Sequence, residues 1–168
     1  MFQDEARVGR ISDPTRCWAP ADIRPVTKAQ IVREYTYVFA AVSPVDGVMD
    51  SLILPRANSE AMSVFLAEVS RRHPDELILM VLDGAGWHRS GELKIPENIR
   101  FLPLPPYCPE LNPAEHLWDE MREKWFGNRL FNSMAQLTDH LVLALQAMES
   151  NPKRLQSLTG FHWILEAP

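Results

Sequence analysis

The chain has 168 residues, of which 46% are hydrophobic and 23% charged, a composition typical of one globular domain. Its 17 lysines and arginines against 22 aspartates and glutamates give a net charge of −5, which excludes an overall basic nucleic-acid-binding surface but not a local one. No apolar run reaches the ~20 residues of a membrane span, and no secretory signal is visible. Two cysteines make no disulfide framework, so we expect a cytoplasmic protein without a membrane partner.

Residues 1–7 read as a strand that begins at the first residue. Because free termini fray unless a sheet holds them, such a strand is uncommon. We therefore expect an excised domain or a truncated reading frame, the alternative being a complete protein with a terminal first strand. Residues 7–34 are predicted to be an irregular connection, punctuated by Pro14, Pro20 and Pro25.

Two strands joined by a tight connection come next. Residues 35–42 are aromatic and β-branched, residues 43–47 have turn chemistry, and residues 48–54 read as a second strand. This pattern predicts a hairpin with a five-residue loop. Asn58 or Ser59 then caps a predicted helix that ends before proline 74.

The run 77–82 is apolar at every position, which favours a central strand covered on both faces, with a parallel neighbour. Residues 99–104 read as another short strand. A helix is predicted to start at Asn112 and Pro113, with Trp118 and Trp125 in the core.

A last helix is predicted to start at Ser133, with Gln136 completing a capping box, and to end at Asn151. The order of strands and helices is that of a mixed α/β fold, and one layered sheet domain is the economical interpretation.

Three acidic residues lie at the ends or starts of predicted elements: Asp4, Asp83 and Glu115. In open α/β sheets the carboxyl ends of strands border the ligand crevice. Three converging carboxylates repel one another unless a cation lies between them, and oxygen ligands favour Mg²⁺ or Mn²⁺ over zinc. Two such ions ~3.5–4 Å apart support in-line displacement at a phosphodiester.

Each of these residues also has a plain structural interpretation. Asp83 with the following glycine can form an ordinary turn, and Glu115 can complete a capping box with Asn112. Asp4 can be a solvated strand end, and His88 is expected in a loop or in the core rather than as a ligand. Composition and periodicity leave these alternatives open.

Three strings resemble the catalytic domain of DDE transposases in the insertion-sequence branch of the mariner-like superfamily. They are FQDE at residues 2–5, LDGAGWH at residues 82–88 and PPYCPELNPAEHLW at residues 105–118. The third string is long and highly specific, the second is intermediate and the first is weak alone. The resemblance extends from Asp4 to about Trp163.

The resemblance implies an RNase H-like α/β fold, a mixed sheet with antiparallel hairpin strands and parallel central strands, flanked by helices. It implies that Asp4, Asp83 and Glu115 are catalytic and bind Mg²⁺ or Mn²⁺, as two ions. Gly84 stands where asparagine is common, which removes an amide that could order Asp83. We expect residues 1–168 to be one catalytic domain, without the N-terminal helix-turn-helix region of family members.

The activity implied by the resemblance is that of a DNA transposase: metal-dependent hydrolysis of a phosphodiester at transposon ends, then transfer of the 3′-OH into target DNA. Two alternatives keep the fold, namely a catalytically idle or DNA-binding-deficient remnant and a purely hydrolytic nuclease. DNA is the implied partner, as transposon ends and as target, and a homodimer is compatible. The implied location is the bacterial cytoplasm, at the nucleoid when the enzyme is active.

Residues 1–34 carry six positive charges against five negative ones. They favour a solvated mixed-charge surface over a loop that faces phosphates. The positive residues are Arg7, Arg10, Arg16, Arg24, Lys28 and Arg33.

Overall fold

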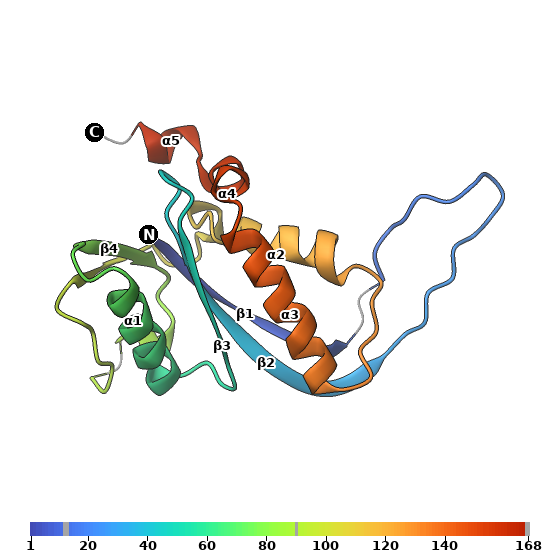
Figure 1. Cartoon of the computed structure of the whole chain (residues 1–168), viewed down its shortest axis with the longest axis horizontal. Helices are drawn as coiled ribbons and strands as arrows, with labels where there is room; N and C mark the ends of the chain where they lie inside the picture. Colours follow the sequence, from blue (N-terminus) through green and yellow to red (C-terminus); the bar gives the residue numbers. More distant parts are fainter. Residues whose placement is uncertain (12–13, 90, 167–168) are drawn as a thin grey trace.

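A mixed sheet forms the centre of the structure, a computed structural model that describes residues 1–11, 14–89 and 91–166 (Figure 1). Within these residues the sheet has five strands in the order β3-β2-β1-β4-β5. β2 pairs antiparallel with β1 and β3, whereas β4 lies parallel to β1 and β5. The strands are β1 (Phe2–Ile11), β2 (Ile31–Val42), β3 (Met49–Leu54), β4 (Ile78–Leu82) and β5 (Ile99–Pro103). The predicted combination of antiparallel and parallel strands is confirmed.

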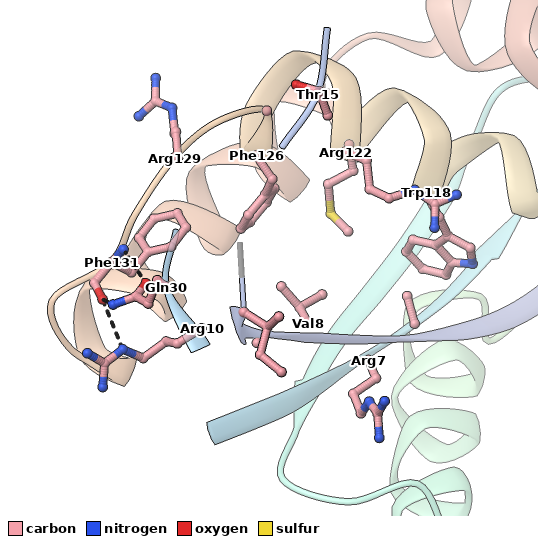
Figure 2. Close-up of a pocket in the computed structure, with 15 residues that line it drawn as sticks. Arg7, Val8, Arg10, Thr15, Gln30, Trp118, Arg122, Phe126, Arg129 and Phe131 are labelled. Carbon is pink, nitrogen blue, oxygen red and sulfur yellow. Dashed lines mark hydrogen bonds between the residues drawn. The ribbon is translucent and has the colours of Figure 1, made fainter. Parts of the chain in front are cut away.

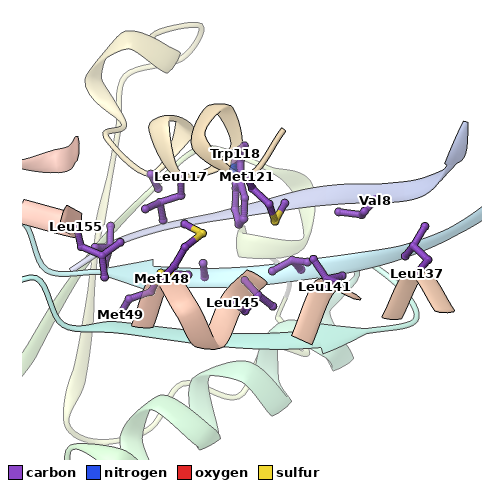
Figure 3. Close-up of a cluster of buried hydrophobic side chains, with 14 of the residues drawn as sticks. Val8, Met49, Leu117, Trp118, Met121, Leu137, Leu141, Leu145, Met148 and Leu155 are labelled. Carbon is purple, nitrogen blue, oxygen red and sulfur yellow. The ribbon is translucent and has the colours of Figure 1, made fainter. Parts of the chain in front are cut away.

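Helices cover both faces of this sheet and bury two separate hydrophobic clusters. Figure 3 shows the cluster on the side of α2 and α3. Alternation along β2 directs Val38 and Ala40 toward α2 and α3, and Phe39 toward α1. The helices are α1 (Ser59–Arg72), α2 (Glu115–Met121), α3 (Met134–Glu149), α4 (Pro152–Thr159) and α5 (His162–Leu165), with a π-helical turn (Arg122–Phe126) after α2 and 3₁₀ turns at Gly86–Arg89 and Pro109–Leu111. No helix in the described ranges is long and apolar enough to cross a membrane.

The first two strands are longer than the sequence predicted. We expected an irregular connection over residues 7–34, but in the described part of that range only residues 14–30 lie outside the strands. Val8 faces the core beneath α2 and α3, which is the burial expected of a strand residue. Gly9 lies opposite Tyr35, and a Cβ at Gly9 would lie 2.3 Å from the Tyr35 ring. The glycine therefore permits this close pairing, although the prolines, arginines and aspartates of residues 7–34 had indicated an irregular connection.

The helix starts follow the predicted capping residues. The Asn58 side chain accepts a hydrogen bond from the Ala61 N–H at the start of α1, and Ser133 accepts one from the Gln136 N–H at the start of α3. The helix that starts at Ser133 was predicted to be the last one, but α4 and α5 follow it. Asn151 caps α4 directly after α3, because its side chain accepts from a backbone N–H of the next turn.

Two expectations about apolar residues are corrected. β4 was predicted to be covered on both faces, but Leu79 is 52% exposed while its neighbour Met80 is fully buried against α1. Trp118 lies in the core as predicted, whereas Trp125 is only half-buried and packs against the His140 ring. Trp125 belongs to the π-helical turn, whose extra residue per turn rotates it out of the buried stripe of α2.

Candidate active site

Asp4, Asp83 and Glu115 line one cavity at the carboxyl end of β4. Phe2 of β1 pairs in parallel with Val81 of β4. Asp4 and Asp83 each lie two residues further along, so they are level with each other on the same side of the sheet. Glu115 is the first residue of α2, which packs on that side. The fold thus gathers around one cavity three residues that are far apart in the sequence.

Two hydrogen bonds fix α2 against β1. The Asn112 amide donates to the Gln3 carbonyl at 3.0 Å, and the Trp118 indole N–H donates to Asp4 Oδ2 at 2.8 Å. The Asn112 backbone N–H donates to a proline carbonyl of the preceding turn, so Glu115 does not complete a capping box. The capping interpretation of Glu115 is therefore wrong, and its position near Asp4 follows from the docking of α2.

Asp4 lies in surroundings that disfavour its charge. Burial raises the pKa of this carboxyl to about 7, and the carboxylates of Glu115 and Glu5 add to the rise, while the bond from Trp118 opposes it. The interpretation of Asp4 as a solvated strand end is therefore wrong. The hydrogen bond from Trp118 favours the negative charge of Asp4, but it does not outweigh burial and the nearby carboxylates.

Asp83 forms a turn after β4, as one interpretation of the sequence predicted, and it also lines the cavity. Its Oδ1 accepts a hydrogen bond from the Ala85 N–H at 2.9 Å and lies 3.0 Å from Nδ1 of His88. The side chain is 59% exposed, so one carboxylate oxygen is oriented by the turn while the group still reaches solvent. Asp83 is therefore oriented by the turn and by His88 while its carboxylate remains accessible to solvent.

His88 is buried, as expected from the sequence. It lies in a polar cluster with Glu5 and Trp87 that was not predicted. Glu5, which is on β1 beside Asp4 but faces the α1 side, accepts hydrogen bonds from Trp87 Nε1 at 2.6 Å and Gln3 Nε2 at 2.7 Å. Burial raises the pKa of Glu5, but His88 and these two donors outweigh it and lower the value. Burial lowers the pKa of His88, and Glu5 and Asp83 together raise it. The available signal was the alternation of the strand, which turns Glu5 away from Asp4.

Of the six basic residues within residues 1–34, two make contacts with other parts of the described structure. Arg10 donates to the Phe131 carbonyl beside an apolar cavity between β1 and the π-helical turn (Figure 2). Arg7 lies over the Tyr35 ring, with its guanidinium carbon 4.6 Å from the ring centroid. The remaining four are exposed: Arg16, Arg24, Lys28 and Arg33.

Comparison with known proteins identifies the family. Residues 1–138 match the profile of the family described as "DDE superfamily endonuclease". The chain belongs to this family. This DDE-family chain is also 38% identical over 130 residues to "Uncharacterized protein y4pE/y4sA" of Sinorhizobium fredii (strain NBRC 101917 / NGR234), a match that covers 77% of the chain and 96% of the relative.

Solved structures support the same fold. The DDE-family chain superposes on "Crystal structure of the Mos1 mariner paired end complex with Mn" with a TM-score of 0.65 at 15% identity, covering 95% of this chain and 53% of that one. For "Crystal structure of the catalytic domain of Mos1 mariner transposase" the TM-score is 0.55 at 12% identity, covering 95% and 79%. The chain thus spans about half the length of Mos1 in its complexes. The predicted RNase H-like fold and the resemblance to DDE catalytic domains are confirmed.

The chemistry of the site fits a divalent cation. Within the residues that the structure describes, no three His, Cys, Asp or Glu side chains converge closely enough to hold a metal as they stand. The cavity of the DDE-family chain is lined by three carboxylates, and the hydrogen bond from Trp118 does not outweigh the burial of Asp4. Oxygen-rich sites with excess negative charge suit hard cations such as Mg²⁺ and Mn²⁺.

Proposed function

We propose that residues 1–168 are one catalytic domain of a DNA transposase, which hydrolyses a phosphodiester at transposon ends and transfers the 3′-OH into target DNA. The observation that carries the proposal is the cavity that Asp4, Asp83 and Glu115 line beside the parallel strands of a DDE-family fold. Relatives of the same fold include "Mos1 transposase paired-end complex with left transposon end", which supports DNA as the substrate class.

In this proposal Asp4, Asp83 and Glu115 hold two ions of Mg²⁺ or Mn²⁺. Bound ions of this kind stabilise charge on the attacking and leaving oxygens of a phosphodiester. The protein contributes orientation: Trp118 fixes one oxygen of Asp4, the turn after β4 fixes one oxygen of Asp83, and Asn112 fixes the helix that carries Glu115. The raised pKa of Asp4 means that burial favours its protonated form, so a bound cation would have to displace that proton.

A cleavage assay tests the proposal and separates it from its alternatives. The 168-residue protein is incubated with Mn²⁺ and supercoiled plasmid, with and without a short duplex that offers a free 3′-OH. We expect nicking by the wild type, covalent joining of the short duplex to the plasmid, and loss of both in Asp4→Asn.

Nicking without joining would favour the purely hydrolytic nuclease. No nicking, or nicking that Asp4→Asn leaves unchanged, would contradict the proposal and favour the idle remnant. The matched control is Asp75→Asn, which removes an exposed carboxylate outside the cavity.

A further inference from the structure

A buried polar cluster lies on the opposite side of β1 from the cavity. The side chains of His88 and Glu5 are only 3% and 10% exposed. Glu5 receives one hydrogen bond on each oxygen, from Trp87 and Gln3. Burying a carboxylate is costly unless donors compensate it, and here two donors are committed to that task.

His88 connects this cluster to the cavity. Its Nδ1 lies 3.0 Å from Oδ1 of Asp83 and 3.1 Å from the Asp83 carbonyl oxygen. Both neighbours are acceptors, so the geometry fits a ring whose Nδ1 carries a proton. Its Nε2 lies 3.6 Å from Glu5 Oε1, which is too long for a hydrogen bond, and the atom is buried without a hydrogen-bond partner in the described structure. The His88 ring therefore contacts Asp83 on one side, and its other nitrogen faces the Glu5 carboxylate.

We propose that His88 and Glu5 are positioning residues that orient the Asp83 carboxylate toward the divalent cation. The inference rests on the proposed metal site. Side chains behind a metal ligand fix its orientation, and their loss typically weakens metal binding or activity ~10–100-fold. Asp83 needs such support because it lies beyond the end of β4, is 59% exposed and is followed by Gly84.

The arrangement lets β1 act on the cavity twice. Asp4 lines the cavity from one face of the strand, and the next residue, Glu5, faces the other side and lies near His88, which contacts Asp83. The positions of both Asp4 and Asp83 therefore depend on β1. A displacement of the turn after β4 relative to β1 would disturb both the His88 contact and the cavity.

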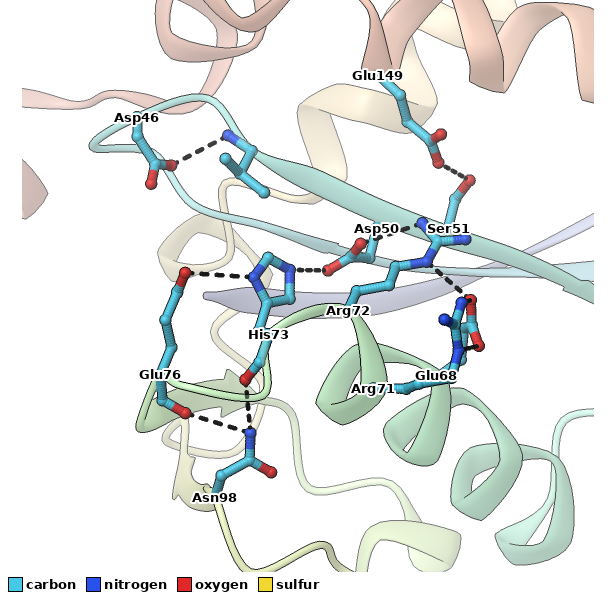
Figure 4. Close-up of polar contacts among 11 residues, drawn as sticks. Asp46, Asp50, Ser51, Glu68, Arg71, Arg72, His73, Glu76, Asn98 and Glu149 are labelled. Carbon is cyan, nitrogen blue, oxygen red and sulfur yellow. Dashed lines mark hydrogen bonds and ion pairs between the residues drawn. The ribbon is translucent and has the colours of Figure 1, made fainter.

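The chain offers a matched control in a second buried histidine–aspartate contact. His73, at the end of α1, lies with Nε2 2.7 Å from Oδ2 of Asp50 on β3 (Figure 4). Its side chain is 13% exposed, and neither residue lines the cavity. His73→Phe and His88→Phe therefore remove the same ring from two histidine–aspartate contacts, although Asp50 is buried and Asp83 is exposed. Only His88→Phe acts next to Asp83.

The test measures the dissociation constant for Mn²⁺ from the electron paramagnetic resonance signal of the free ion, together with the melting temperature in EDTA. We expect His88→Phe and Glu5→Gln to weaken Mn²⁺ binding ~10–100-fold. His73→Phe is expected to lower the melting temperature and to leave the Mn²⁺ dissociation constant unchanged. His88→Asn keeps an N–H donor near the position of Nδ1 and is expected to recover most of the lost affinity.

Wild-type affinity in both His88→Phe and Glu5→Gln, with affinity lost in Asp83→Asn, would overturn the positioning role and leave the proposed metal site intact. Unchanged affinity in Asp83→Asn would instead remove the metal site on which both proposals rest. Equal weakening by His73→Phe and His88→Phe would reduce the role of His88 to general stability and overturn the inference. Because Glu5→Gln preserves side-chain volume, it keeps the test decisive if His88→Phe does not fold.

Discussion

Asp4 and Glu5 are consecutive acidic residues on one strand, yet the fold treats them in opposite ways. Asp4 faces α2, where burial and the nearby Glu115 raise its pKa to about 7 despite one hydrogen bond from Trp118. Glu5 faces the α1 side, where Gln3, Trp87 and His88 surround it and lower its pKa despite burial.

The difference separates two uses of a buried carboxylate. One whose charge is fully compensated by the protein supports structure and orientation. One whose charge the protein compensates only in part is suited to a positive charge from outside the protein. Among carboxylate neighbours, a divalent cation is the simplest source of that positive charge. Substitutions on the Asp4 side and on the Glu5 side of β1 should therefore have different effects.

The largest effect is expected from Asp4→Asn on cleavage. Loss of a direct metal ligand removes several kcal/mol of transition-state stabilisation, and ~4 kcal/mol corresponds to a rate lower by ~10³-fold. Glu5→Gln is expected to cost less, ~10–100-fold, because it acts through Asp83. Initial nicking rates in Mn²⁺ measure both, and equal losses in the two variants would erase the proposed distinction.

The pH dependence of stability should have opposite signs for the two residues in EDTA. The folded pKa of Asp4 lies above its ordinary value of 3.8, so the folded state holds this proton longer than the unfolded state. Stability from this group therefore falls as the pH rises from ~4 to ~7, by ~4 kcal/mol at most. The folded pKa of Glu5 is lowered, so its contribution is present above its unfolded value and is lost as the pH falls.

Melting curves from pH 4 to 8 measure these signs. Asp4→Asn should match the wild type near pH 4 and exceed it in stability near pH 8. Glu5→Gln should be destabilised most at the higher pH. An Asp4→Asn variant that melts below the wild type at pH 8 would show that the charge of Asp4 is compensated after all.

A smaller effect is expected from Asn112→Ala. The buried Asn112 amide joins α2 to the Gln3 carbonyl of β1, and its removal leaves that carbonyl without this donor. We expect a loss of ~1–3 kcal/mol in the free energy of unfolding, measured by urea denaturation. The same variant should bind Mn²⁺ more weakly, because α2 carries Glu115; unchanged binding would mean that α2 is held in place by packing alone.

The smallest effect is expected from Trp118→Phe. The substitution keeps most of the packing in the core but removes the N–H that donates to Asp4 Oδ2. We expect a loss of ~1 kcal/mol in unfolding free energy and a further rise in the pKa of Asp4. Carboxylate NMR titration of Asp4 follows that rise, and a fall would contradict the assigned role of the indole.

Much of the fold could be predicted from local patterns. The cap at Asn58, the hairpin after β2 and the apolar run of β4 each reflect short-range preferences that the tertiary structure preserves. The far half of β1 could not, because Gly9 is acceptable in that strand only through its pairing with Tyr35, a partner from the next strand. The exposure of Leu79 likewise depends on which elements cover a face, which periodicity does not report.

The candidate site divides in the same way. Asp4, Asp83 and Glu115 could be proposed because each lies at the end or start of an element and within a recognisable string. The cluster of Glu5, Trp87 and His88 could not, since Glu5 and its partners are more than 80 residues apart and the contacts exist only once β1 and β4 lie side by side.

Crystals soaked in Mn²⁺ and measured at the manganese absorption edge would show directly whether the cavity binds the ion. We expect an anomalous peak in the cavity, bonded to carboxylate oxygens of Asp4 and Asp83 and approached by Glu115, and no such peak in Asp4→Asn. An ordered cavity without manganese at concentrations that support cleavage, or a peak bound elsewhere that persists in Asp4→Asn, would contradict this expectation.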